Sequence, residues 1–186
     1  MNNINNLESK FYEALIQLKP SKRIKGEIGV FAIRNIKVGT IVGDIKFLNE
    51  NIFYSREQYQ TLDKTTQEII NKFCIQTEEG FYGPPNINYL SIPWYINHSC
   101  SGNVGFDDIG NFITIKYIRK GEELCYDYSF TGSKPINMSR CNCGSKNCRK
   151  VITGEEWKDL NYRKKNFKYF MPELKNLISS LNKNNN

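Results

Sequence analysis

Histidine and long apolar runs are what this 186-residue sequence has least of, and its one histidine is His98. No run approaches the roughly 18 apolar residues of a membrane-spanning helix, so we expect no membrane contact. The first twenty residues lack an apolar segment and a small-residue cleavage site, and we expect no secretory signal peptide. Internal repeats and long linkers are also missing, which favours one domain.

Acidic residues are the second shortage. The chain has 26 Lys and Arg against 19 Asp and Glu, which gives a formal net charge of +7. This balance favours acidic surfaces, nucleic acid or anionic ligands as partners, although a solvated basic surface is an equally good interpretation. The stretch RKKNFKYF at 163–170 mixes cations with aromatic rings, as single-strand nucleic-acid binders do, but an ordinary helix face explains it as well.

Three of the six cysteines are clustered. We expect the protein to be intracellular, in the reducing cytoplasm. In a eukaryote, or after delivery to a host cell, we expect it to be nuclear and associated with chromatin. Clustered cysteines there indicate a metal more often than disulfides. Cys141, Cys143 and Cys148 have the spacing C-x-C-x4-C, which can wrap three sides of a tetrahedral Zn²⁺. The spacing does not identify the fourth ligand, for which the candidates are Cys74, Cys100, Cys125 and His98.

Apolar residues at helical spacing predict a helix near each end of the chain and one in the middle. The first ends at Pro20 and the second, over 55–73, has Ser55 as its N-cap. Thr153 with Glu156 is a capping-box pattern for a helix that carries Trp157. A last helix is expected to begin at Pro172. The first helix is defined by Leu7, Phe11, Leu15 and Leu18.

Short apolar runs between turn residues predict the remaining structure as strands. The run at 103–118 predicts a hairpin that turns at Gly110-Asn111. The other expected strands cover 29–35, 40–45, 73–77, 80–83 and 123–130.

Four segments, taken together and in order, resemble the SET-domain family of protein-lysine methyltransferases. One resembles the family's Gly-rich cofactor-binding opening, one its Asn-His-Ser-Cys motif, one its Tyr-Asp-Tyr strand, and the last its post-SET zinc motif. The compact build is similar to bacterial or viral members. The segments are GEIGVFAIRNIKVG at 26–39, YINHSC at 95–100, GEELCYDYSF at 121–130 and CNCGSKNCRK at 141–150.

The resemblance implies a mainly β (α+β) fold, a β-clip of small antiparallel sheets. The family fold has a pseudoknot, a short insert helix, a zinc-bound post-SET loop and, in this chain, C-terminal helices. The implied divisions are an N-terminal helical extension, the SET domain, the zinc loop and a C-terminal helical segment, at 1–22, 23–132, 133–152 and 153–186.

The same resemblance implies the ligands. S-adenosylmethionine would be the cofactor, S-adenosylhomocysteine its product, and one structural Zn²⁺ would be bound by Cys100, Cys141, Cys143 and Cys148. Cys74 and Cys125 would then be small buried apolar residues. The implied cofactor-binding residues are Ile28, Gly29, Val30, Phe31, Tyr95, Asn97, His98, Tyr128 and Trp157.

The implied activity is methyl transfer to a protein lysine, with Tyr128 as the catalytic tyrosine. Tyr126, two residues earlier, would limit the product to one methyl group or at most two. A histone tail is one candidate substrate, and a monomer is expected. Aromatic candidates for the lysine channel are Phe73, Phe81 and Tyr82.

Two other functions remain open at this point. One is a catalytically silent, zinc-containing module that binds chromatin or nucleic acid through its basic surface. The other is methylation of a non-protein amine. The chain departs from the family pattern at Trp94, where the family commonly has arginine, and at Gly102, where it usually has proline.

Overall fold

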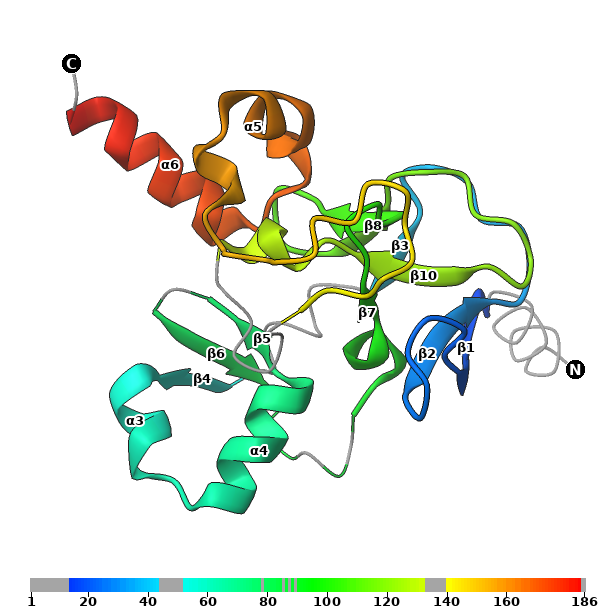
Figure 1. Ribbon diagram of the computed structural model, residues 1–186, viewed down its shortest axis with the longest axis horizontal. Coiled ribbons are helices and arrows are strands. Elements are labelled where there is room, and N and C mark those ends of the chain that lie inside the picture. Colours follow the sequence, from blue (N-terminus) through cyan, green and yellow to red (C-terminus); the bar gives the residue numbers. More distant parts are fainter. Residues whose placement is uncertain are drawn as a thin grey trace, which may run out of the picture.

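The computed structural model describes residues 14–43, 52–77, 79–84, 86, 88, 90–132 and 140–184 (Figure 1). Its strands form a larger sheet at the centre and a smaller one beside it, and helices lie on the smaller sheet and at the C-terminal end. The expectation of a mainly β chain with small, mostly antiparallel sheets and C-terminal helices is confirmed.

The described part of the chain begins with a β-hairpin rather than with the predicted helix. Strand β1 (Ile16–Pro20) pairs antiparallel with β2 (Ile28–Ala32) without a break in register. The helix predicted to end at Pro20 is therefore wrong for these residues, while Leu7 and Phe11 lie outside the described residues. The physical reason is non-local: β2 pairs with β10 along one edge, and β1 satisfies the hydrogen-bonding groups of its other edge.

The larger sheet has seven strands among the described residues, in the order β1-β2-β10-β8-β9-β3, and β7 also pairs with β10. Strand β10 is its centre, because it is antiparallel to β2 and parallel to both β7 and β8. Segments far apart in sequence therefore meet at β10. The bounds are β3 Ile41–Gly43, β7 Asn97–His98, β8 Val104–Phe106, β9 Phe112–Thr114 and β10 Glu123–Tyr126.

The predicted hairpin over 103–118 is confirmed as β8 and β9. The carboxylate of Asp107 accepts hydrogen bonds from the backbone N–H groups of Ile109 and Asn111, which closes the turn. Strand β10 is shorter than predicted, because the chain leaves the sheet after Tyr126 and forms the 3₁₀ helix η3 (Tyr128–Thr131).

The smaller sheet has the order β4-β6-β5 and carries two helices. Ser55 is the N-cap of α3, with a capping box to Gln58, as predicted. The predicted helical region is divided at Leu62, and Asp63 caps the second helix. The bounds are β4 Ile52–Ser55, α3 Arg56–Thr61, α4 Lys64–Phe73, β5 Ile75–Gln76 and β6 Gly80–Gly83.

The C-terminal segment is helical, and its last helix begins at Pro172 as predicted. The capping-box prediction is only half right: Glu156 accepts a hydrogen bond from the Thr153 N–H, but Asp159 is the residue that caps the following α-helix. Trp157 lies instead on a short 3₁₀ helix. The bounds are η4 Glu156–Lys158, α5 Leu160–Asn166, η5 Phe167–Tyr169 and α6 Pro172–Asn184.

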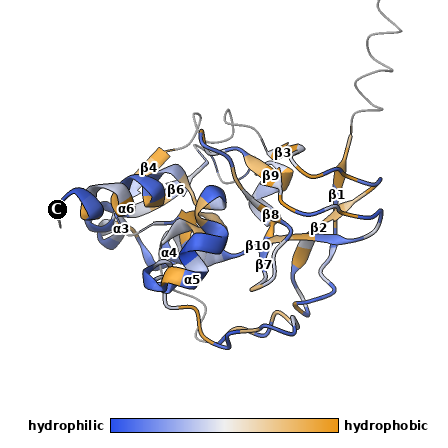
Figure 2. Cartoon of the chain, turned by 90° about the horizontal axis from the view of Figure 1, so that it is seen from above, coloured by the Kyte–Doolittle hydropathy of each residue, from blue (hydrophilic) through white to orange (hydrophobic). Residues whose placement is uncertain are grey.

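One hydrophobic core joins the larger sheet to the C-terminal helices. Val30, Leu124 and Phe106 from the strands are fully buried, and Leu174 and Ile178 bring α6 onto the same cluster. Figure 2 shows apolar stretches along the central strands and hydrophilic ones along α5 and α6. Among the described residues, no helix combines the length and apolar character needed to cross a membrane.

Candidate active site and cysteine cluster

A cavity of about 780 Å³ lies where the larger sheet, the inserted helix α4 and the cysteine-bearing loop meet. One side is formed by Ile28 of β2, by residues 93–98 and by the end of β10, and the other by residues 68–76 and 140–143. The volume is in the range of pockets that enclose a drug-sized ligand or cofactor. The cavity is therefore the candidate site for a small molecule.

Asn97 connects two strands at the cavity wall. Its Nδ2 donates to the carbonyl of Ile28 at 2.9 Å and to Oε1 of Glu123 at 3.3 Å. Glu123 is buried and also accepts from the Ser21 hydroxyl at 2.7 Å. A side chain on Gly29 would collide with the Glu123 carboxylate, so this close approach requires glycine at Gly29.

Two tyrosines lie side by side at the end of β10. The ring centroids of Tyr126 and Tyr128 are 4.7 Å apart, and both residues line the cavity. Tyr126 ends β10 and Tyr128 begins η3, so the two rings meet where the chain leaves the strand at Asp127. The hydroxyl of Tyr128 donates to the carbonyl of Ile96 at 3.4 Å.

Both phenols are neutral hydrogen-bonding groups. Burial raises the pKa of Tyr126 well above its ordinary value and also raises the pKa of Tyr128. Neither tyrosine therefore ionises near neutral pH. The hydroxyl of Tyr128 is suited to orienting a bound group rather than removing a proton from it.

Other aromatic residues complete the cavity wall. Phe73 contacts Tyr95 edge to face, with centroids 5.8 Å apart, and both line the cavity. Phe112 packs against Tyr126 at 5.4 Å, and Trp94 also lines the cavity. No cavity role was predicted for either residue: Phe112 lies outside the four motif segments, and Trp94, directly before YINHSC, stood out only as a departure from the family pattern.

The structure brings most of the predicted cofactor residues to this cavity, but not all of them. Ile28, Tyr95, Asn97, His98 and Tyr128 line it. The remaining four, which are buried, are not among its lining residues: Gly29, Val30, Phe31 and Trp157. Of the three aromatic candidates for a lysine channel, Phe73 lines the cavity, whereas Phe81 and Tyr82 do not.

Potential metal ligands gather next to the cavity. The ligand atoms of His98, Cys100, Cys141 and Cys143 all lie within 4.8 Å of one another. The cysteine loop is closed by a hydrogen bond from the Cys141 N–H to the carbonyl of Lys150 at 2.7 Å. Three thiols and an imidazole form a donor set that suits Zn²⁺.

Cys148, the fourth predicted metal ligand, lies at the edge of this group. Its Sγ donates to the carbonyl of Cys141 at 3.2 Å, and it also interacts with the Cys141 thiol. Burial opposes ionisation of Cys143, but hydrogen bonds to Ser145, Cys100 and Cys141 together outweigh burial and lower the pKa of that thiol. The cluster thus contains at least one thiol that readily becomes the thiolate a metal requires.

His98 is neutral, because burial lowers its pKa to about 4. Its Nδ1 accepts a hydrogen bond from the backbone N–H of Tyr128 at 3.2 Å, so the ring proton is assigned to Nε2. Nε2 lies 3.3 Å from the Sγ of Cys100. His98 therefore joins the tyrosine segment to the cysteine cluster.

The other two cysteines are not part of the cluster of metal-ligand atoms. Burial raises the pKa of Cys74 and of Cys125 to about 12, so both remain thiols. Cys125 lies on the central strand, and Cys74 lines the cavity.

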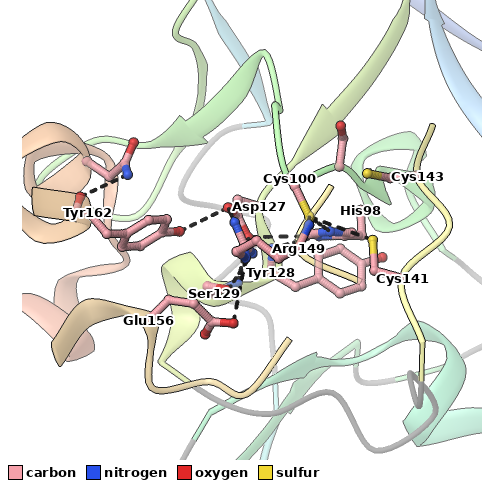
Figure 3. Close-up of polar contacts among 12 residues, drawn as sticks. His98, Cys100, Asp127, Tyr128, Ser129, Cys141, Cys143, Arg149, Glu156 and Tyr162 are labelled. Carbon is pink, nitrogen blue, oxygen red and sulfur yellow. Dashed lines mark hydrogen bonds and ion pairs between the residues drawn. The ribbon is translucent and has the colours of Figure 1, made fainter. Parts of the chain in front are cut away.

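A buried ion pair lies on the other side of His98 (Figure 3). The guanidinium of Arg149 donates to both carboxylate oxygens of Asp127, each at 2.6 Å, and to the hydroxyl of Ser129 at 2.9 Å. The hydroxyl of Tyr162 donates to Asp127 at 2.9 Å. Burial opposes the charge of Asp127, but Arg149 outweighs burial and lowers the pKa of this carboxyl. No local sequence pattern indicated this network.

Comparison with known proteins identifies the class. A family model of the SET domain matches residues 27–129, which include β2, most of the cavity wall and the tyrosine pair. The chain therefore belongs to the SET-domain family.

Curated relatives match over shorter stretches. The chain is 46% identical over 63 residues to human "Histone-lysine N-methyltransferase 2D", 31% over 137 residues to "Histone-lysine N-methyltransferase trr" of Drosophila melanogaster, and 33% over 84 residues to "Histone-lysine N-methyltransferase Su(var)3-9" of Drosophila pseudoobscura pseudoobscura. These alignments cover 30%, 69% and 35% of this chain. They span only 1%, 5% and 13% of the respective relatives.

Proposed function

We propose that this protein is an S-adenosylmethionine-dependent protein-lysine methyltransferase. The observation that carries the proposal is the cavity, in which Asn97 and Ile28 lie on the same wall as Tyr126 and Tyr128. Asn97 and its neighbours would hold the cofactor, and the aromatic part would hold the lysine. The relatives, which are named histone-lysine methyltransferases, support a lysine substrate, and a histone is the first candidate.

The cofactor supplies an electrophilic methyl group, and the chain has to align a neutral amine with it. A lysine with a pKa near 10.4 costs about 4–5 kcal/mol to deprotonate at neutral pH, at ~1.36 kcal/mol per unit. An aromatic channel lowers that cost, because it desolvates the ammonium ion. Tyr128 would orient the amine through its hydroxyl, with the carbonyl of Ile96 close by.

One Zn²⁺ is proposed to bind to Cys100, Cys141, Cys143 and Cys148. His98 is also close enough, but its Nε2 carries the ring proton as long as Nδ1 accepts the N–H of Tyr128. Coordination by Nε2 would remove that acceptor and leave the Tyr128 amide without its partner. In the proposed arrangement, the Nε2 proton faces the sulfur of Cys100, and the zinc fastens the loop beside the cavity.

The product is proposed to carry one methyl group, or at most two. Tyr126 is buried, and its ring contacts Phe106, Phe112 and Tyr128. Its hydroxyl, or a water bound to it, would fill the space that a methylated amine needs when it rotates for a second transfer.

The direct experiment uses labelled S-adenosylmethionine with zinc-loaded protein and a panel of histones, cell-lysate proteins and small amines. We expect label on lysine residues of proteins. Label on small amines alone would replace a protein substrate with a non-protein one. Complete absence of transfer, with the cofactor demonstrably bound, would contradict the proposal.

Nucleic-acid binding is a second candidate function, favoured by one surface. Lys164, Lys165 and Lys168 are exposed and form no ion pair with the described residues, and Phe167 beside them is 37% exposed. Lys116, from another part of the chain, lies close to this group. Its pKa is lowered mainly by partial burial and, to a smaller extent, by the charge of Lys165. Phosphates would be attracted to this group, and bases could stack on the ring.

The salt dependence of binding to a single-stranded oligonucleotide tests this second function. Replacing both Lys164 and Lys165 by alanine should reduce the slope of log affinity against log salt by about 0.7 per lost phosphate contact. The matched control is the double replacement of Lys37 and Lys120, which are equally exposed. An equal slope in both variants would rule out a specific role for this surface.

A further inference from the structure

The structure assigns a positioning role to Arg149: its guanidinium holds the chain on both sides of Tyr128, so that the tyrosine reaches its working position only when the cysteine loop is docked. This inference rests on the proposed function, because it concerns the geometry of the same reaction. Arg149 itself touches neither the cavity nor the reacting atoms.

Arg149 contacts the chain on both sides of Tyr128. Arg149 binds the carboxylate of Asp127 and the hydroxyl of Ser129, which are the residues immediately before and after Tyr128. The Tyr128 N–H donates to His98. Three consecutive residues are therefore held by Arg149 and His98, and the side chain of Tyr128 is left to line the cavity.

The guanidinium is supplied by the cysteine loop. Arg149 directly follows Cys148, and its own N–H donates to the Sγ of Cys100 at 3.4 Å. Its position thus depends on the cysteine loop rather than on η3, which carries Tyr128. Loop docking and tyrosine placement are coupled through this side chain (Figure 3).

The C-terminal segment contacts both members of the ion pair between Arg149 and Asp127. Tyr162 of α5 donates to the same carboxylate, and the guanidinium carbon of Arg149 lies 5.5 Å from the centroid of its ring. Glu156 lies 3.7 Å from Nε of Arg149. The arginine is therefore confined from two further sides, and Tyr162 supplies a second, independent handle on Asp127.

A surface ion pair would have none of these properties. Asp127 is 3% exposed, and a planar guanidinium is the side chain that can serve both carboxylate oxygens and a hydroxyl at once. A lysine ammonium keeps the charge but lacks this fork. Arg149→Lys therefore separates the geometric role from the electrostatic one.

The test compares steady-state kinetics of zinc-loaded wild type, Arg149→Lys and Tyr162→Phe. The control is Arg119→Lys, which alters an exposed pair with Glu122. We expect kcat to fall at least about tenfold in Arg149→Lys and about threefold in Tyr162→Phe, because small displacements of a positioned group cost up to about a hundredfold. Both KM values should stay within about twofold, and zinc content should be unchanged.

A folded, zinc-loaded Arg149→Lys protein with wild-type kcat would overturn the inference, as would a rise in KM at constant kcat. If that variant does not fold, Tyr162→Phe decides by the same criteria. Hydrogen exchange at the Tyr128 amide supplies a readout that needs no turnover: exchange should accelerate about tenfold in Arg149→Lys and stay unchanged in Arg119→Lys. Wild type without methyl transfer would refute the proposed function, and the exchange result would still test this inference.

Discussion

The two sides of the cavity are built in different ways. The side formed by β2, β7 and β10 belongs to the central sheet, where Val30 and Leu124 are fully buried and backbone hydrogen bonds connect each strand to its neighbours. On the other side are α4, whose one buried residue is Ile70, and the cysteine loop. Residues 140–155, all of which the structure describes, form no helix or strand.

The loop is fastened by side chains instead. The clustered cysteines contact one another, Arg23 donates to the carbonyl of Cys143 at 2.9 Å, and Arg149 binds Asp127. The sheet side can form through burial alone, whereas the loop side requires ligands and ion pairs to hold its shape. We therefore expect the loop side to respond to metal and to point mutations far more than the sheet side does.

Removal of the metal should have the largest effect, and it should affect the loop side of the cavity. Cys143→Ser should lose zinc and cofactor binding together, because a structural Zn²⁺ contributes roughly 10–16 kcal/mol of apparent binding free energy. Elemental analysis and calorimetry measure the two losses, and Cys125→Ser, at a cysteine outside both the cluster and the cavity lining, is the control that should keep both. A metal-free wild type with full activity would show that the loop needs no metal.

The pH dependence of single-turnover methyl transfer should come next in size. The substrate lysine has to lose a proton, so the rate should rise about tenfold per pH unit above neutrality. Burial raises the pKa of Tyr126 and of Tyr128, so their neutral forms persist and no falling limb should appear below pH ~10. A decline between pH 8 and 9.5 would mean that a tyrosine ionises, contrary to its burial.

A smaller effect is expected on the sheet side, where replacement of Asn97 should reduce the stability gained on cofactor binding. Wild type should gain about 2.7 kcal/mol of unfolding free energy at a cofactor-product concentration of 100 Kd. Asn97→Ala should lose most of this gain, because it removes the contacts to Ile28 and Glu123 that shape the wall. Thermal unfolding with and without S-adenosylhomocysteine measures it, and Asn161→Ala on α5 is the exposed control. Equal gains in all three proteins would place the cofactor elsewhere.

The smallest effect is expected at Tyr126. Tyr126→Phe removes one hydroxyl, and a single hydrogen bond contributes about 0.5–1.5 kcal/mol. The first transfer should change little, while the number of methyl groups per lysine should increase in the mass spectrum of the product. Tyr117→Phe, at a tyrosine that is 52% exposed, is the matched control. Trimethyl product from the wild type would contradict this assignment.

Local signals predicted those parts of the fold that depend on neighbours in sequence. The cap at Ser55, the hairpin turn near Gly110 and the helix that begins at Pro172 each follow from residues within a few positions. Strand β1 was missed because pairing with β2 decides its conformation, and apolar spacing is ambiguous for so short a segment. Trp157 lies on η4 and packs in the core, and its contact with the cofactor stays a prediction.

The candidate site divides in the same way. The C-x-C-x4-C spacing is local and indicated the metal, whereas Cys100, 41 residues before Cys141, needed a family resemblance to be chosen. The pairing of Arg149 with Asp127 joins residues 22 positions apart and has no signature in either neighbourhood. Contacts of this kind depend on how the loop packs, which composition and periodicity do not encode.

Tyr128, which begins η3 just after β10, is proposed to align a lysine for methyl transfer. A single-turnover assay of zinc-loaded wild type and Tyr128→Phe, with a lysine-containing peptide and intact-mass detection, tests it most directly. We expect the wild type to transfer one methyl group. Tyr128→Phe should show at least about a hundredfold slower transfer with cofactor affinity unchanged, as expected for loss of an orienting group. Equal rates in the two proteins would contradict it.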